Sequence, residues 1–355
     1  MKLARPAVFI FGAGATRGAF HDALIPPPVD NDFFDIANQL QGHGTETLAR
    51  RVLASVWDLY NETRGISLEQ YYRDLETREG IGRFVKPPNQ PMRWGKRRKE
   101  LEELIRRVYI HTTCDTSGPS FKPKASEIHQ QILKHLVPGD TIVTFNYDLV
   151  IEESLKQLTT WRPTDGYGVK VHGSTGEWCK NWISSGNQTT RSREIESKVL
   201  LLKLHGSINW RLYNNNQIRL KDRPYVVRRN RANKPGRETI SILPPGWKKE
   251  GITHQPFSAF WREAGTRLQN CKSIIILGYS LPETDLLAQA LFAEIIRSRA
   301  SRGKKALLRE LYLAEPNEKV KAKFSKIFSP VLGPSGELFK SENIQEFCTS
   351  LEKSA

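Results

Sequence analysis

AVFIFGAGAT, residues 7–16, joins five consecutive apolar residues to a glycine-rich turn. Such an apolar run is typical of a strand that is buried on both faces, as the strands of a parallel sheet are. The two glycines after the run allow a tight turn and a close approach of the backbone to a phosphate, whose charge favours the start of the next helix. The stretch therefore predicts the strand, turn and helix that open an α/β sheet.

The rest of the chain repeats this alternation of apolar strand and amphipathic helix. We expect strands at residues 141–145, 199–204, 274–277 and 311–314, and helices at residues 128–136, 283–297, 317–327 and 343–353. Regular alternation of strand and helix favours a parallel sheet with helices on its faces. The sequence predicts a Rossmann-like α/β fold, doubly wound.

Two segments interrupt this pattern. Apolar residues recur at helical spacing from about residue 46, and Ser67-x-x-Gln70 is a capping-box pattern, so about 35–125 is expected to be a helical insertion. About 160–250 is rich in Gly, Asn, Pro, Trp and Arg, which predicts a loop-rich basic insertion with short strands around residues 199–204. We therefore expect one domain over residues 1–355 with two insertions.

Composition is that of a folded, cytoplasmic protein. Apolar residues make up 38% of the 355 residues and charged residues 26%. No apolar stretch approaches the roughly 18 to 20 residues that cross a bilayer, and the first apolar run lacks a signal-peptide pattern, so no membrane contact is expected. Four cysteines lie far apart, at positions 114, 179, 271 and 348, and predict neither a zinc module nor a disulfide framework. No metal is expected.

The charge points to an anionic ligand or partner. Lys and Arg total 54 against 38 Asp and Glu, a formal net charge of +16. Basic residues gather at Lys96-Arg97-Arg98-Lys99 and again between residues 219 and 237. These stretches are consistent with a solvated surface or with salt-sensitive contacts to nucleic acid, and the sequence leaves both open.

Polar or glycine-rich residues follow each expected strand. In an open parallel sheet, ligands bind at the carboxyl ends of the strands, so these segments are expected to line one crevice. They are Gly12-Ala13-Gly14-Ala15-Thr16, Asn146-Tyr147-Asp148, His205-Gly206-Ser207, Gly278-Tyr279-Ser280 and Glu315-Pro316-Asn317.

Four of these segments, taken in order, resemble the SIR2-like family. The resemblance rests on GAGAT at 12–16, TFNYD at 144–148, KLHGS at 203–207 and GYS at 278–280, and the loop at 26–34 also looks like that of bacterial members. It implies a domain that binds NAD as its substrate. Departures from the protein-deacylating sirtuins are the missing four-cysteine zinc module, the missing proline-phenylalanine-arginine loop, and Thr16 where serine is usual. The missing zinc module favours NAD hydrolysis over deacylation, and the other two departures concern how the nicotinamide site closes.

The resemblance also implies roles for individual residues. Asn146 would bind the ribose hydroxyl or the attacking water, His205 would take a proton, and Asp148 would accept from the carboxamide of nicotinamide. Cofactor binding is expected from Gly12, Ala13, Gly14, Thr16, Arg17, Gly278, Tyr279, Ser280 and Glu315. His172 carries the same His-Gly-Ser pattern as His205, but a longer apolar run precedes His205, which is therefore preferred.

We therefore expect an NAD glycohydrolase that yields nicotinamide and ADP-ribose, and the resemblance implies an effector of prokaryotic antiviral defence. Unrestrained hydrolysis of NAD is toxic, so control is expected from a homo-oligomer or from a partner such as a translocase-type ATPase or a nucleic-acid-guided protein. The alternatives are an NAD- or ADP-ribose-binding module in a nucleic-acid-associated complex and, third, an NAD-dependent protein deacylase.

Overall fold

The computed structural model describes residues 3–42, 44–82, 84, 94–118, 121–158, 161, 166–168, 171–175, 199–213, 217–221, 224, 239–242 and 257–353. Its strands are β1 (Ala7–Phe11), β2 (Cys114–Asp115), β3 (Lys122–Pro123), β4 (Thr141–Thr144), β5 (Val171–Thr175), β6 (Leu200–Lys203), β7 (Gly206–Tyr213), β8 (Gln217–Lys221), β9 (Thr239–Ile242), β10 (Ser273–Leu277), β11 (Leu308–Ala314) and β12 (Leu332–Ser341). Its α-helices are α1 (Ala13–Ala19), α2 (Phe33–Gln39), α3 (Thr45–Tyr60), α4 (Leu68–Ile81), α5 (Trp94–Thr113), α6 (Glu127–Leu133), α7 (Val150–Leu158), α12 (Phe257–Asn270), α13 (Leu286–Ser301), α14 (Glu318–Phe328) and α15 (Ile344–Glu352). Short 3₁₀ turns lie at η1 (Asp30–Asp32), η2 (Gly303–Ala306) and η3 (Ser329–Val331).

The main sheet confirms the predicted Rossmann-like α/β fold. Its six strands lie in the order β12-β11-β10-β1-β4-β6, and every neighbouring pair is parallel. From β1 the chain adds β4 and β6 on one side, then returns to add β10, β11 and β12 on the other. The direction of winding therefore switches between β1 and β10, where open α/β sheets bind their ligands.

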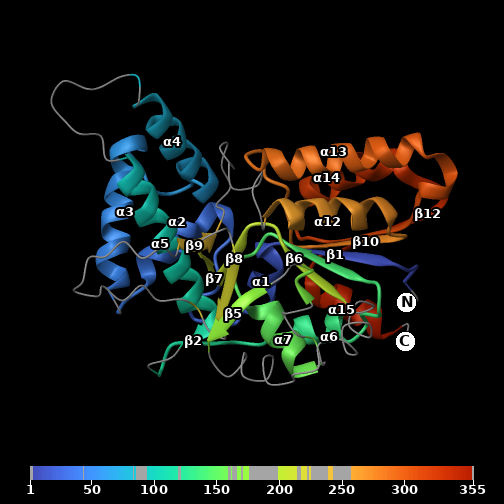
Figure 1. The fold of residues 1–355 in the computed structure, drawn as a ribbon, viewed down its shortest axis with the longest axis horizontal. Helices are drawn as coiled ribbons and strands as arrows, with labels where there is room; N and C mark the ends of the chain where they lie inside the picture. The colour runs from blue at the N-terminus through green and yellow to red at the C-terminus, as the bar shows by residue number, and fades with distance from the viewer. Residues whose placement is uncertain are drawn as a thin grey trace.

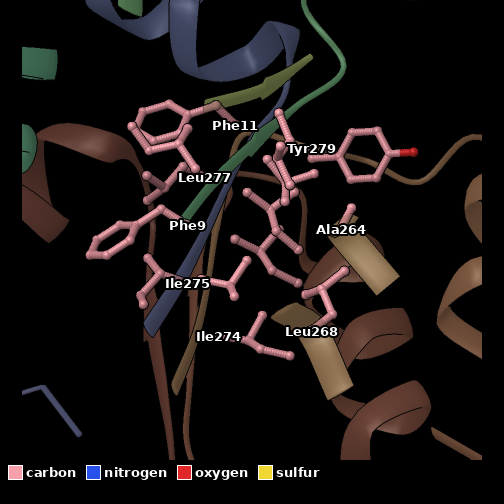
Figure 2. Packing of buried hydrophobic residues seen from close by; sticks show 14 of the residues in the cluster. Phe9, Phe11, Ala264, Leu268, Ile274, Ile275, Leu277 and Tyr279 are labelled. Carbon is pink, nitrogen blue, oxygen red and sulfur yellow. The ribbon is translucent and has the colours of Figure 1, made fainter. Parts of the chain in front are cut away.

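The central strands β1 and β10 are buried at every position because helices cover both faces of the sheet. Phe9, Phe11, Ile275 and Leu277 lie on one side of β1 and β10, and Ile274 lies on the other side with Leu268 of α12 (Figure 2). All are buried. Figure 1 shows α12, α13 and α14 over one face of the sheet, and α6, α7 and α15 over the other.

Helix α13 begins later than the sequence pattern predicts. The helix was expected from residue 283, but Asp285 is its N-cap and its side chain accepts from the backbone nitrogen of Ala288. Residues 281–285 therefore form a loop after β10. Strand β12 was not predicted at all, because Gly333, Pro334 and Gly336 break its apolar pattern and its edge position needs little burial.

Helices α2 to α5 pack together beside the carboxyl ends of the sheet strands (Figure 1). Ser67 caps α4 by accepting from the nitrogen of Gln70, as the sequence predicted. The apolar residues of these helices form a second buried cluster, which also includes Tyr147 and Leu149 after β4 and Ile208 of β7. The helical group is therefore anchored directly on the segments that follow the sheet strands.

The described part of residues 160–250 contains more regular structure than the sequence indicated. Strands β5, β8, β7 and β9 form a second, four-stranded sheet in that order. Ile208 and Trp210 of β7 and Ile218 and Leu220 of β8 are buried at alternate positions, a period of two that polar and basic neighbours obscure. Among the described helices, none is long and apolar enough to cross a membrane.

Candidate active site

A cavity of about 780 Å³ lies where β1 and β10 end. This volume falls within the usual range for small-molecule and cofactor sites. Nine of the residues predicted from the sequence line it: Ala13, Gly14, Arg17, Asn146, His205, Gly278, Tyr279, Ser280 and Glu315. Gly12, Thr16 and Asp148 do not line it; they lie behind its wall, where Gly12 and Thr16 bond to Asn146 and Thr16 bonds to Asp148.

The glycines of the first turn pack against the turn after β10. The nitrogen of Gly14 donates to the carbonyl oxygen of Gly278 at 2.9 Å, and a Cβ atom at Gly12 would lie 2.4 Å from that same oxygen. Gly278 has φ of +56°, and a Cβ there would lie 2.1 Å from the nitrogen of Ala15. These glycines are therefore required for contact between two loops, in addition to any approach to a phosphate.

Asn146 ties the segment after β4 to the turn after β1. Its Nδ2 donates to the carbonyl oxygen of Gly12 at 3.0 Å and to Oγ1 of Thr16 at 3.1 Å. The Thr16 hydroxyl in turn donates to Oδ2 of Asp148 at 3.1 Å. Both hydrogens of the Asn146 amide are thereby used, which leaves its Oδ1 as the atom that can accept from a ligand.

Asp148 belongs to a buried support behind the cavity. Its Oδ1 accepts from the backbone nitrogen of Val150 at 3.0 Å, and Lys203 donates to its carbonyl oxygen. Burial raises the pKa of the Asp148 carboxyl, and the nearby Lys203 ammonium opposes that rise. Lys203 also pairs with Glu152 at 2.8 Å, and both side chains are 1% exposed. The KLHGS segment thus supplies a buried cation as well as His205.

His205 lies between the main sheet and the second sheet, directly after β6. Its ring is surrounded by aromatic rings: Phe145 at 5.2 Å edge-on, Tyr147 at 6.2 Å nearly parallel, and Trp261 at 6.4 Å, between ring centroids. Its Nε2 lies 3.5 Å from Oδ2 of Asp285. The imidazole therefore has little freedom to rotate and faces a carboxylate.

Asn146 and His205 lie at strand ends, as predicted, but each is only 4% exposed. Asn146 also holds two loops together, through its bonds to Gly12 and Thr16. Buried polar groups that lose a partner destabilise a fold.

Charged side chains line the cavity from the first helix and from α14. Arg17 pairs with Asp32, and burial lowers the pKa of the Arg17 guanidinium. Lys319 and Lys323 of α14 also line the cavity. Glu315, at the end of β11, accepts from the nitrogen of Asn317 at 3.2 Å, and burial raises the pKa of its carboxyl. One part of the cavity therefore offers cations to an anionic ligand, and Glu315 offers an acceptor.

Several lining residues were not predicted from the sequence. Ser67, Leu68 and Glu69 of the α4 start and Tyr109 of α5 reach the cavity from the helical group. Glu69 accepts from the Thr284 hydroxyl, which joins α4 to the loop after β10. No sequence spacing relates these residues to the strand ends. The Pro-Glu-Thr-Asp run at 282–285 carried a helix-cap signal, but nothing in it indicated a contact with His205.

The structure also locates His172, the alternative to His205, and part of the two basic stretches. The backbone of His172 lies in β5 of the second sheet. In the first basic stretch, Lys96, Arg97 and Arg98 form ion pairs with Glu100, Asp58 and Glu79 respectively. Of the second basic stretch, most residues, including Arg223, Arg228, Arg229, Arg231, Lys234 and Arg237, lie outside the described residues.

The chain is similar to one protein family and to several solved structures. A family model described as a SIR2-like domain matches residues 140–330, more than half of the chain. No curated protein sequence matches significantly. Among solved structures, a mutant Sir2 homologue in complex with 2′-O-acetyl-ADP-ribose is 14% identical, with 99% of this chain and 93% of that chain covered and a TM-score of 0.43. A Sir2 homologue in complex with NAD is 12% identical, with 98% and 88% covered and a TM-score of 0.43.

Proposed function

Because the chain belongs to the SIR2-like domain family, we propose that it binds NAD in this cavity and hydrolyses the bond between nicotinamide and ribose. One observation carries the proposal. Asn146 and His205, which end two different strands, line the same cavity as Arg17 of the first turn. A neutral acceptor, a titratable base and a cation are thereby gathered in one site.

The reaction needs a hydrogen-bond acceptor and a base for the attacking water more than an acid for the leaving nicotinamide. The bond between C1′ of the ribose and the ring nitrogen breaks, and its electron pair leaves with neutral nicotinamide. A water oxygen bonds to C1′ and loses one proton, so NAD⁺ and water give nicotinamide, ADP-ribose and H⁺. The transition state resembles an oxocarbenium ion, as in glycoside hydrolysis. Positioning and proton removal are therefore what the protein must supply.

Asn146 supplies the acceptor. Since its Nδ2 is held by Gly12 and Thr16, its Oδ1 is presented in a fixed direction. This oxygen accepts from the attacking water or from the ribose hydroxyl without adding charge to the site. In this proposal Asp148 acts from behind the wall, by holding the Thr16 hydroxyl at 3.1 Å, and does not contact the nicotinamide carboxamide.

His205 supplies the base. A neutral imidazole accepts a proton near neutral pH, from the ribose hydroxyl or from the water. The aromatic rings of Phe145, Tyr147 and Trp261 pack around it, and little of the His205 side chain is exposed to solvent. Exclusion of bulk water strengthens the electrostatic interactions of the site.

The remaining lining residues orient the rest of the NAD molecule. Arg17 binds the diphosphate through its guanidinium, with Lys319 and Lys323 contributing positive charge from α14. Ser280 contacts a phosphate or ribose, and Glu315 accepts from the hydroxyls of the adenosine ribose. NAD then lies across the switch between β1 and β10, with nicotinamide beside Asn146.

The experiment that tests this function separates hydrolysis from deacylation. Purified chain is incubated with NAD, with and without an acyl-lysine peptide, and the products are quantified by chromatography. Hydrolysis predicts equal amounts of nicotinamide and ADP-ribose with no need for peptide. Release that depends on peptide, with acylated ADP-ribose as product, identifies a deacylase instead. Binding of ADP-ribose without any NAD loss identifies a binding module.

The family resemblance further supports a role in prokaryotic antiviral defence, where cleavage depletes cellular NAD. Such an activity must be restrained until infection, by oligomerisation or by a partner protein. Expression of the chain during phage infection, with cellular NAD measured over time, tests this role. Depletion of NAD that begins only after infection supports it, and NAD that stays constant throughout infection contradicts it.

A further inference from the structure

Asp285 lies beside His205 but belongs to none of the sequence segments that predicted the site. Its Oδ2 is 3.5 Å from Nε2 of His205. We propose that Asp285 is a positioning residue, which fixes the orientation of the His205 ring and stabilises the imidazolium that forms when His205 accepts a proton. The inference rests on the proposed function, in which His205 is the base.

The Asp285 carboxylate is held in place from two sides. Its Oδ1 accepts from the nitrogen of Ala288 at 3.3 Å, which caps α13, and its Oδ2 accepts from the Tyr279 hydroxyl at 3.1 Å. Tyr279 is itself fixed, because its ring stacks on Phe145 at 4.1 Å between centroids. One oxygen is therefore committed to the helix, and the other is kept directed toward His205.

Burial makes the charge of Asp285 effective at His205. Asp285 is 1% exposed and His205 4%, so little water lies between them to screen the interaction. Among the described residues, Glu69, Tyr109 and Tyr72 act with Asp285 on the hydroxyl of Tyr147, and Glu69 acts with Asp285 on that of Tyr279. The Asp285 carboxylate favours positive charge on the imidazole, and burial of the ring opposes it.

The contact favours a proton on Nε2 of the neutral His205 ring, because a carboxylate accepts from an N–H donor. The distance of 3.5 Å is long for a hydrogen bond, and such contacts shorten when the ring becomes charged.

Asp285→Asn tests the inference, because asparagine caps helices as well as aspartate does and removes only the charge. We expect kcat for nicotinamide release to fall at least about tenfold, with KM for NAD within about threefold. The acidic limb of the pH–rate profile should move down by about one pH unit, since the neutral base now persists at lower pH. Glu294→Gln, an exposed carboxyl on the same helix, is the matched control and should change neither.

A second measurement does not require activity. The pKa of His205 is followed by NMR on histidine-labelled protein, with the signal identified by its loss in His205→Gln. We expect that pKa to fall by about one unit in Asp285→Asn. In Tyr279→Phe, where Asp285 loses a donor but keeps its charge, we expect it to rise by a few tenths of a unit.

The outcomes separate the two proposals. A wild-type chain that leaves NAD intact contradicts the proposed function, while the histidine titration still decides the role of Asp285. An unchanged His205 pKa in Asp285→Asn, or a fall in kcat with no movement of the pH profile, overturns the positioning role. If Asp285→Asn does not fold, Tyr279→Phe decides: a fall in the pKa of His205 contradicts the inference.

Discussion

Nδ2 of Asn146 donates a 3.0 Å hydrogen bond to the carbonyl oxygen of Gly12, across 134 positions of sequence. The bond joins the ends of the neighbouring strands β4 and β1 at the rim of the cavity. It satisfies a buried backbone carbonyl and at the same time directs Oδ1 of the amide away from the loop. Loop assembly and ligand recognition therefore depend on the same side chain.

Asn146→Ala is expected to lower the free energy of unfolding by about 1–3 kcal/mol, because the carbonyl of Gly12 and the hydroxyl of Thr16 lose a buried donor. Urea unfolding measures the loss. Asn270→Ala, which removes an exposed amide from the end of α12, is the control and should cost less than about 0.5 kcal/mol. Equal stability of the wild type and Asn146→Ala contradicts the role of the amide in joining the loops.

Gly278→Ala should destabilise the fold by at least about 2 kcal/mol, since the added Cβ meets backbone atoms of Ala15 and Gly14 and the position has positive φ. Gly139→Ala is a matched control: its φ of +95° is also positive, but no atom lies within 4 Å of the added Cβ. Thermal unfolding of both variants separates the clash from the backbone strain. Similar losses at both sites argue against the close packing of the two glycine turns.

Stability should fall with acid because of His129. Burial lowers the pKa of His129 to about 3, and among the described residues its Nε2 has no hydrogen-bond partner. Between about pH 3 and the ordinary His pKa of 6.5, His129 binds a proton in the unfolded chain but not in the folded chain. Stability is therefore full above pH 6.5 and falls below it, by at most about 1.4 kcal/mol per pH unit from this group.

His129→Phe should reduce that acid dependence, because phenylalanine does not titrate and can stack on Phe11 as the imidazole does. Urea unfolding of both proteins at several values between pH 4 and 7 makes the comparison. The difference in stability between variant and wild type should grow in favour of the variant as the pH falls. A constant difference across this range contradicts the assignment to His129.

Arg17→Gln is expected to weaken the binding of ADP-ribose by about 10- to 100-fold, the usual cost of a lost charge-assisted hydrogen bond. Isothermal titration calorimetry measures it. Arg297→Gln, at an exposed position on α13, controls for the change in net charge. Affinity that is the same in Arg17→Gln and Arg297→Gln places the diphosphate away from the first turn.

The sequence predicts those parts of the site that local patterns encode. Each strand of the main sheet except β12 is marked by an apolar run, and the carboxyl end of a parallel strand is a binding position by topology alone. Asn146, His205 and Glu315 could therefore be assigned to one cavity. Arg17 follows from its place in the short helix after β1.

The remaining features depend on long-range packing that sequence patterns do not encode. Asp285 gives a helix-cap signal, and only the folded chain brings it to His205. Glu69 reaches the cavity because the helical group packs on the segments after β4, an arrangement that no spacing specifies. The bond from the Thr16 hydroxyl to Asp148, which ties the turn after β1 to the segment after β4, is likewise a contact between distant residues that no local pattern specifies.

Nicotinamide release from NAD by the wild-type chain, compared with Asn146→Ala and His205→Ala, tests the central claim most directly. ADP-ribose affinity, measured in all three proteins, shows that the cavity is still formed. The account predicts steady release by the wild type and a loss of at least about 100-fold in each variant that still binds ADP-ribose. Wild-type rates in both variants, or intact NAD with a wild-type chain that binds ADP-ribose tightly, would contradict it.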